Sequence, residues 1–502
     1  MNCVQHFFNA AETYPNHTAI IAEDRSISYA ALKREVVATA RYFESKGIRA
    51  GDRVLVFVPM SVDLYRIVLA LFSMGATAVF VDEWVSKKRM ELCCEIAQCR
   101  GFIGVTKAHF LRLVSKELRA IPIRLKIKHA FNADEGFTLF EPDQQTAALI
   151  TFTTGSTGTP KAANRTHAFL MAQFEAIRKK IDPKPTDVVL PALPIVLFIN
   201  LGVGSTSVIY RYKSTKLHTI QPTMVFDLMN KHRVNQVISS PSFIHALANY
   251  ALSENESVPS LQTIYTGGAP VFPSEAKCYA AAFPNAKIEV IYGSTEAEPI
   301  AAVPVDELIS ASTAEKGLLV GFPDPSAEVK IIPFRDEVIE LAENQTLDTC
   351  GVHEIGEIIV AGKHVLSSYL NNPEALRRAK IWENEKMYHR TGDSGYLDDE
   401  GRLYLVGRSS QVFEINGEMI YPFLVENSLR EVDGILRGTI VKQGEQVVII
   451  AELKSATRQE EVRSQLLEKF DFPFTFIVAK IPLDKRHHGK IDQEALLNRL
   501  EA

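Results

Sequence analysis

The chain has 502 residues, of which 46% are hydrophobic and 23% are charged. These ordinary globular values exclude disorder, collagen and coiled coil as the main architecture. Its 55 Lys and Arg against 60 Asp and Glu give a net charge of −5, which argues against a dedicated binder of nucleic acid or of anionic membranes, because such proteins carry a basic excess. The length predicts roughly three units of domain size.

The sequence carries no pattern typical of export or membrane insertion. Its N-terminal residues lack the basic segment and apolar run of a signal peptide. The longest apolar stretch, Ile67 to Val81, is interrupted by polar residues and is shorter than the ~18–20 residues that cross a bilayer. Six cysteines are too few for a disulfide framework in so long a chain. We therefore expect a cytoplasmic protein without a transmembrane segment.

The first part of the chain alternates apolar strands with helical patterns. Residues 53–59, 77–82 and 101–106 predict buried strands, and residues 63–74 and 87–99 predict helices between them. This alternation is typical of a parallel sheet with crossover helices.

Apolar segments that predict strands continue in the middle of the chain. Residues 234–241, 261–270 and 287–295 predict strands that run into loops of small residues. Loops at the carboxyl ends of strands are where α/β folds bind ligands.

After about residue 350 the pattern changes. Residues 356–362, 402–407 and 410–418 predict short β-rich segments with glycine-marked turns, and a compact α+β unit of about 90 residues follows them. We place a domain boundary near Arg408–Ser410.

The strongest chemical signal is the segment TFTTGSTGTPK at 151–161. Its glycines let the backbone approach phosphate oxygens, its hydroxyls donate hydrogen bonds to them, and Lys161 adds positive charge. The segment lacks the Gly-Lys-Ser/Thr ending of a Walker loop. It therefore predicts a polyphosphate site of another kind.

Six motifs resemble, in order and spacing, those of the adenylate-forming superfamily of acyl-CoA synthetases, peptide-synthetase adenylation domains and luciferases. They extend over nearly the whole chain: TTGSTGTPK at 153–161, TGGAP at 266–270, YGSTE at 292–296, HRTGD at 389–393, Gly407-Arg408 and Gly489-Lys490. Any one of these motifs could arise by chance, whereas all six in the same order argue strongly against another family.

The resemblance implies an α/β fold with two domains. A large AMP- and acyl-binding domain, residues 1–408, would contain parallel-rich sheets with crossover helices and a β-barrel-like subdomain. A small mobile α+β domain, residues 409–502, would act as a lid and carry the catalytic lysine.

The resemblance also implies ATP as cofactor. Tyr292 would lie against the adenine ring, Asp393 would accept hydrogen bonds from the ribose hydroxyls, and Arg408 would neutralise charge on the ribose or phosphate side. The other implied nucleotide contacts are Thr153, Thr154, Gly155, Ser156, Thr157, Gly158, Lys161, Gly268, Ala269, Pro270, Gly293 and Ser294.

Three residues are implied in the chemistry itself. Thr295 would hydrogen-bond the α-phosphate, and Glu296 would bind Mg²⁺, a hard cation that prefers carboxylate and phosphate oxygens. Lys490 would donate to the substrate carboxylate and the α-phosphate as negative charge develops there.

The chain departs from the family pattern at several positions. Ser410 stands in the hinge where Asp or Lys is typical, Glu414 stands where Lys is frequent, and Ala162 replaces a glycine. The segment 190–202, LPALPIVLFINLG, lacks the histidine that commonly follows an aromatic residue near the acyl pocket and thiol tunnel. These departures leave adenylation intact and put thioester formation in doubt.

The expected acyl pocket is apolar. An amino-acid substrate would need an acidic partner for its ammonium group, and no such residue stands out, so a hydrophobic acid such as a fatty acid fits better. The same candidate residues are equally consistent with plain core. They are Phe198, Ile199, Gly202, Val203, Pro241, Ser242, Phe243 and Gly267.

We therefore expect an AMP-forming ligase in which the substrate carboxylate attacks the ATP α-phosphorus, pyrophosphate leaves and the lid rotates. Transfer of the acyl group to CoA as co-substrate ranks first, from its frequency in the family. Closure of a β-hydroxy acyl-adenylate to a β-lactone ranks second, because residues 190–202 and the ending PLDKRHHGKID resemble the β-lactone synthetase branch. Transfer to a carrier-protein thiol ranks third.

A rival of a different class is a catalytically idle protein that binds acyl groups or nucleotides, since a fold does not fix a function. Retention of Glu296, Asp393 and Lys490 together argues against it. The expected partners are a small-molecule acid and ATP, with no nucleic acid, while an acyl-carrier protein and a homodimer stay open.

Overall fold

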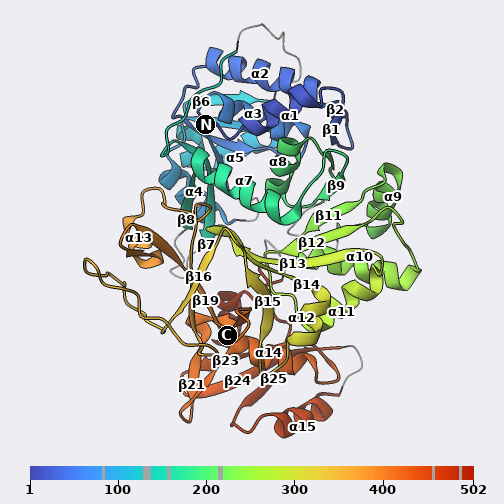
Figure 1. Cartoon of the computed structure of the whole chain (residues 1–502), viewed down its shortest axis with the longest axis vertical. Helices are drawn as coiled ribbons and strands as arrows, with labels where there is room; N and C mark the ends of the chain where they lie inside the picture. The colour runs from blue at the N-terminus through green and yellow to red at the C-terminus, as the bar shows by residue number, and fades with distance from the viewer. Residues whose placement is uncertain are drawn as a thin grey trace.

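The computed structural model describes residues 1–81, 85–127, 137–154, 160–212, 219–454, 458–484 and 489–501. The chain has a mixed α/β fold with a large N-terminal domain and a small C-terminal one. In Figure 1 the N-terminal segments, blue to green, form the upper part, and the last segments, orange to red, form the lower part.

The smaller of the two large sheets lies in the upper part, and its neighbouring strands are parallel except for the last pair. In spatial order its strands are β6 (Ile123–Lys126), β5 (Gly101–Gly104), β3 (Arg53–Phe57), β4 (Thr77–Phe80), β7 (Ala147–Thr154) and β8 (Pro160–Thr166). The helices α3 (Val62–Ser73) and α4 (Lys87–Ala97) connect β3, β4 and β5. The strands and helices predicted between residues 53 and 106 are therefore confirmed.

The larger sheet runs from the upper part to the lower and changes from parallel to antiparallel on the way. Its parallel part, with the antiparallel edge strand β2, comprises β2 (Ser26–Ser28), β1 (Thr18–Ile21), β10 (Thr206–Val208), β9 (Val188–Pro191), β11 (Gln236–Ser239), β12 (Thr263–Gly267) and β13 (Lys287–Ser294). Its antiparallel part comprises β14 (Ala297–Pro304), β15 (Leu318–Pro323), β20 (Leu403–Arg408), β19 (Lys386–Leu397), β17 (Gly356–Ala361) and β16 (Glu328–Ile332), with β18 (Lys380–Glu383) beside β19. This antiparallel part stands where the barrel-like subdomain was expected, and among the described residues its strand order continues the parallel strands without closing on itself.

Helices cover the sheets, and several begin at a serine whose hydroxyl accepts a backbone N–H. Ser61 accepts from Leu64 at the start of α3, and Ser86 accepts from Arg89 at the start of α4. No described helix combines the length and the hydropathy needed to cross a membrane. The remaining helices of the large domain are α1 (Gln5–Thr13), α2 (Tyr29–Ser45), α5 (Thr106–Val114), α6 (Lys116–Ala120), α7 (His167–Ile181), α8 (Pro194–Val203), α9 (Pro222–His232), α10 (Pro241–Glu254), α11 (Pro273–Ala282), α12 (Val305–Ala311) and α13 (Pro373–Ala379).

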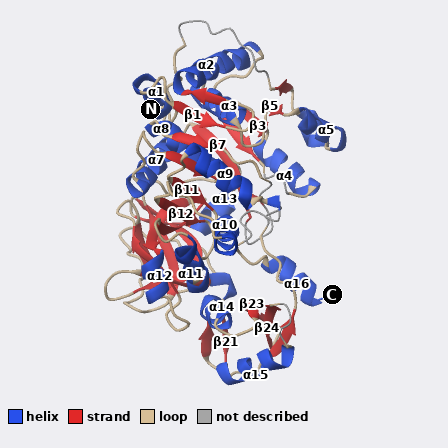
Figure 2. Ribbon diagram, turned by 90° about the vertical axis from the view of Figure 1, so that its right-hand side faces the viewer, coloured by secondary structure: helices blue, strands red, loops and turns tan. Residues whose placement is uncertain are grey.

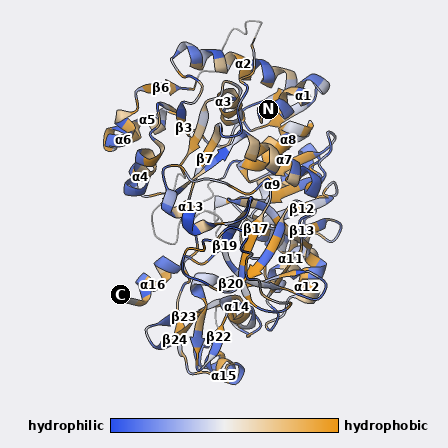
Figure 3. Cartoon of the chain, turned by 60° about the vertical axis from the view of Figure 1, so that its left-hand side comes forward, coloured by the Kyte–Doolittle hydropathy of each residue, from blue (hydrophilic) through white to orange (hydrophobic). Residues whose placement is uncertain are grey.

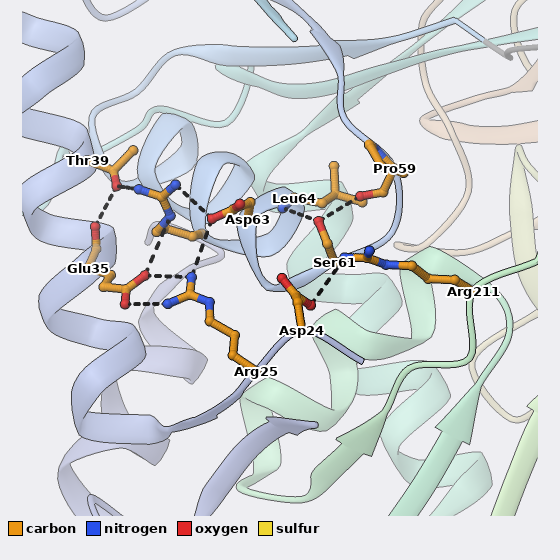
Figure 4. A network of polar contacts seen from close by, with 10 residues as sticks. Asp24, Arg25, Glu35, Thr39, Pro59, Ser61, Asp63, Leu64 and Arg211 are labelled. Atoms are coloured by element: carbon orange, nitrogen blue, oxygen red, sulfur yellow. Dashed lines mark hydrogen bonds and ion pairs between the residues drawn. The ribbon is translucent and has the colours of Figure 1, made fainter. Parts of the chain in front are cut away.

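A buried polar network joins α2 and α3 inside the upper part (Figure 4). Arg66 is only 1% exposed; its guanidinium donates to Asp63 Oδ1 at 2.8 Å and to Thr39 Oγ1 at 2.9 Å. Arg25 forms a bidentate ion pair with Glu35, with N–O distances of 2.7 and 2.9 Å. Each buried charge therefore has an opposite charge beside it, which burial requires.

The C-terminal residues form sheets of their own. These are the hairpin of β21 (Phe413–Ile415) and β22 (Glu418–Ile420), and the sheet of β23 (Ile435–Gln443), β24 (Gln446–Leu453) and β25 (Thr475–Val478), with α14 (Pro422–Arg430), α15 (Gln459–Lys469) and α16 (Gln493–Glu501). Arg430 of α14 joins this unit to the large domain, since it lies 3.9 Å from the ring centroid of Phe272 and 3.6 Å from Glu275 Oε1. The exact boundary at residue 408 stays a prediction.

Candidate active site

A cleft of about 2350 Å³ lies where the two sheets and the C-terminal unit meet. It gathers most of the described residues that the motifs marked. Among those that line it are Thr153, Lys161, Gly267, Gly268, Ala269, Pro270, Tyr292, Gly293, Ser294, Thr295, Glu296, Asp393, Arg408 and Lys490. Gly155, Ser156, Thr157 and Gly158 lie outside the described residues, and so does the side chain of Thr154.

One corner of the cleft is built around the carboxylate of Asp393. The Tyr292 hydroxyl donates to its Oδ2 at 2.8 Å, and Arg408 donates to its Oδ1 at 2.6 Å. Burial and the nearby carboxylate raise the pKa of Tyr292 well above its usual value, so that its hydroxyl stays a donor. The charge of Asp393 likewise raises the pKa of Arg408. A fixed carboxylate beside a flat ring is suited to hold a nucleoside by its hydroxyls and its base.

The strands explain how residues so distant in sequence meet here. In the ladder of β19 and β20, Asp393 stands directly opposite Arg408, while β13 carries Tyr292. A β-carbon on Gly267 would lie 2.4 Å from the Ile291 carbonyl oxygen, and Gly268 has a φ of +89°. Both positions therefore require glycine, and the TGGAP loop can lie close against β13.

A second corner of the cleft is built around Glu296. Its Oε1 accepts hydrogen bonds from the Tyr369 hydroxyl at 3.1 Å and from the Thr153 hydroxyl at 3.4 Å. Arg165 donates to the Thr295 carbonyl oxygen at 3.2 Å, which fixes the backbone beside Glu296. Sequence reasoning missed Tyr369 and Arg165, because neither belongs to a motif that it used.

Two lysines lie near this carboxylate. Lys161 lies 5.8 Å from the ring centroid of Tyr369, and burial lowers its pKa. Lys380 at the start of β18 is 4% exposed, and its ammonium has no hydrogen-bond partner among the described residues. Burial lowers the pKa of Lys380 to about 7, against the attraction of Glu296. Lys161, which lines the cleft, thus offers positive charge on this side, as a site for phosphates requires. Sequence reasoning missed Lys380 because a lone lysine gives no signal.

Lys490 reaches the cleft from the C-terminal unit. The Asp484 carboxylate accepts the backbone N–H of Gly489 at 3.2 Å and that of Lys490 at 3.0 Å. The Lys490 carbonyl accepts the N–H of Asp484 at 2.8 Å. These bonds fix the backbone on both sides of residues 485–488, which lie outside the described residues. Asp484 therefore positions the backbone of Lys490, a role that sequence reasoning did not assign.

The acyl candidates divide into two groups. Phe198 and Gly267 line the cleft, and Phe198 packs edge-on against Tyr65 with ring centroids 5.1 Å apart. The other six, Ile199, Gly202, Val203, Pro241, Ser242 and Phe243, are not among the residues that line it. Instead, the apolar start of α8 contributes, with Pro194, Ile195 and Val196. Further apolar and aromatic lining that carries no motif comes from Pro59, Met60, Phe80, Tyr210 and Tyr212.

Comparison with known proteins gives matches over most of the chain. The model of the family described as AMP-binding enzyme matches residues 7–370. An olefin β-lactone synthetase from Xanthomonas campestris pv. campestris is 31% identical over 514 aligned residues, covering 95% of this chain and 91% of that protein.

Solved structures with the same fold cover the entire chain or nearly so. An amide bond synthetase from Marinactinospora thermotolerans has a TM-score of 0.84 at 20% identity and covers 99% of both chains. An O-succinylbenzoate coenzyme A synthetase from Bacillus subtilis, in complex with ATP and magnesium ion, has a TM-score of 0.79 at 23% identity and covers 96% of this chain and 97% of that one. The arrangement of a large and a small domain is common to these folds.

Proposed function

Because this chain belongs to the AMP-binding enzyme family and is an AMP-forming acid ligase, we propose that it activates a hydrophobic β-hydroxy acid and closes it to a β-lactone. The observation that carries the choice of the second step is the 31% identity to an olefin β-lactone synthetase along nearly the whole of both chains. Sequence reasoning alone ranked transfer to CoA first. In this proposal lactone closure ranks first, and the identity supports that choice.

In the first step the substrate carboxylate attacks the α-phosphorus of ATP, and the bond to pyrophosphate breaks. Tyr292 offers a flat face to the adenine, and Asp393 accepts from the ribose hydroxyls while Arg408 balances its charge. Lys161 brings positive charge toward the phosphates, and Lys490 donates to the oxygens on which negative charge develops. Positioning and charge neutralisation suffice for this chemistry, which needs no protein nucleophile.

The residues present fit a Mg²⁺ ion at Glu296. Two hydroxyls hold one oxygen of this carboxylate at the edge of the cleft. Among the described residues no group of three His, Cys, Asp or Glu side chains gathers to bind a metal. Glu296 would therefore hold Mg²⁺ together with phosphate oxygens, the usual arrangement for this ion. When bound, the ion would neutralise phosphate charge.

In the second step the β-hydroxyl oxygen bonds to the acyl carbon, the bond from that carbon to the AMP oxygen breaks, and the hydroxyl proton passes to the phosphate of the departing AMP. The nucleophile and the electrophile belong to one molecule, so the attack is unimolecular once the acyl-adenylate is bound in the cleft with its β-hydroxyl near the acyl carbon. The apolar residues Ile195, Val196 and Phe198 line the cleft where the family commonly carries an aromatic-His pair. Such a wall keeps water from the reactive adenylate until the hydroxyl attacks.

The test is mass spectrometry of the products from matched fatty and β-hydroxy fatty acids with ATP, with and without CoA. We expect repeated AMP release from the β-hydroxy acid without CoA, with a product lighter than the acid by one water. The fatty acid that lacks the hydroxyl should stop at one adenylate per enzyme. Turnover that begins only when CoA is added, with an acyl-CoA product, would contradict the lactone proposal and support the CoA ligase.

A further inference from the structure

Helix α5 turns its apolar side toward solvent. Phe110, Leu113 and Val114 are 64%, 74% and 57% exposed. Their spacing of i, i+3 and i+4 places them on one face of the helix. Among the described residues of α5 only Ala108 is buried. A surface helix normally faces its apolar stripe to the core, so this orientation needs an explanation that packing among the described residues does not supply.

Positive charge is concentrated on the same segment. Residues 100–127 carry seven Lys and Arg against one acid, Glu117, a net charge of +6. Because the whole chain has −5, the residues outside this segment sum to −11. The mild overall acidity therefore conceals one strongly basic region. The exposed cations on α5, α6 and β6 are Lys107, Lys116, Arg119, Arg124 and Lys126.

The basic and apolar residues share one border of the molecule. Figures 2 and 3 both show α5 at the outer edge of the upper part, and Figure 3 shows α6 next to it. β6 is the edge strand of the smaller sheet. Cations on an edge strand guard against unwanted strand pairing, and this accounts for Arg124 and Lys126. It does not account for an apolar face on the neighbouring helix.

We propose that α5, α6 and β6 form a docking surface for an anionic lipid bilayer. A helix that lies in a membrane interface inserts apolar side chains among the acyl chains and pairs flanking Lys and Arg with lipid phosphates. Phe110, Leu113 and Val114 supply the first part, and the exposed cations named above supply the second. A nucleic acid would use the cations alone and would leave the exposed apolar residues without a role.

The position of the surface suits an enzyme that draws a water-insoluble acid from a membrane. Helix α6 contacts α4, and Arg89 and Cys93 of α4 line the cleft. Docking would therefore bring one wall of the cleft near the bilayer. The idea that the enzyme draws its substrate from the membrane rests on the proposed hydrophobic substrate, whereas the docking surface itself does not.

The test is co-sedimentation of the full chain with vesicles of phosphatidylcholine alone and with vesicles containing about a third of phosphatidylglycerol. We expect binding to the anionic vesicles that weakens as salt is raised. The variant F110S/L113S/V114S and the variant K107Q/K116Q/R119Q should each lower the partition coefficient at least about tenfold. Pyrophosphate release with a soluble short-chain acid should stay unchanged, which shows that the variants are folded and separates this test from the proposed function.

Matched controls carry the same substitutions at exposed positions elsewhere. M224S/L252S/L467S removes three exposed apolar side chains, and K231Q/K277Q/K363Q removes three exposed cations; both should bind as the unmodified chain does. Absence of binding to anionic vesicles, or equal loss in controls and α5 variants, would overturn the proposal. Self-association or nucleic-acid binding that the α5 variants abolish, without vesicle binding, would assign the surface to a second copy or to a nucleic acid instead.

Discussion

Replacing Lys380 by methionine should stabilise the protein in a way that depends on pH. The side chain is 4% exposed, its ammonium has no hydrogen-bond partner among the described residues, and burial lowers its pKa from 10.5 to about 7. The unfolded chain binds this proton at any pH below about 10.5, whereas the native state binds it only below about 7. Between these limits native stability therefore falls as the pH falls, and below about 7 it falls no further.

The size of the effect follows from the pKa difference. Each pH unit between about 7 and 10 should change the stability by about 1.4 kcal/mol. The K380M variant has no ammonium group at this position, so its stability lacks this dependence on pH. The proton's contribution to its stability advantage should therefore be largest at pH 7 and below, where it reaches about 4 kcal/mol, and should shrink by about 2 kcal/mol by pH 9. Any change in packing between lysine and methionine adds a constant that does not vary with pH.

Urea unfolding followed by circular dichroism from pH 6 to 9 measures this difference. The exposed Lys363 provides the control, because K363M should give a profile parallel to that of the unmodified chain. Parallel profiles for K380M as well would refute the reasoning, since they would mean that Lys380 binds its proton equally in the native and unfolded states.

Other predictions concern the chemistry and the domain contact. K490A should slow acyl-adenylate formation by at least about 10²-fold, measured as pyrophosphate release, with ATP binding little changed; near-normal release would disprove the role of Lys490. E296Q should shift the Mg²⁺ requirement to higher concentration in a metal titration, and an unchanged titration would make Glu296 structural. Y369F should reproduce a weaker form of that shift, because it removes a hydroxyl that holds the Glu296 carboxylate. R430A should increase hydrogen exchange in α14, because it removes the cation–π contact with Phe272, and unchanged exchange would mean that other contacts suffice.

The sequence predicted the corner of the cleft around Asp393 better than it predicted the lining of the expected acyl pocket, because the two depend on different features of the chain. Three residues of this corner, Tyr292, Asp393 and Arg408, lie on strands and within short motifs. Such motifs depend on the local backbone conformation, so the identity and order of their residues can be recognised in the sequence. Their mutual hydrogen bonds depend on the pairing of β19 with β20 and could not be predicted from spacing alone.

Whether a candidate residue lines the expected acyl pocket depends on which side of its helix faces the cleft. Phe198 of α8 lines the cleft, whereas its neighbour Ile199 packs in the core. Phe243 of α10 is fully buried among the residues of another core cluster. A run of apolar residues is consistent with either environment, because both bury hydrocarbon. The sequence therefore indicated the segment without resolving the individual side chains.

The register of β19 and β20 has a consequence for any movement of the small domain. Arg408 is the last residue of β20, and the short 3-10 helix Ser409–Gln411 follows it directly. The guanidinium that pairs with Asp393 thus belongs to the final residue held by the large sheet. A rotation that begins at Ser409 would therefore have its pivot next to the ion pair of Arg408 and Asp393. Such a rotation would leave Tyr292, Asp393 and Arg408 in place, because all three belong to strands of the large sheet, and it would move Lys490 relative to them.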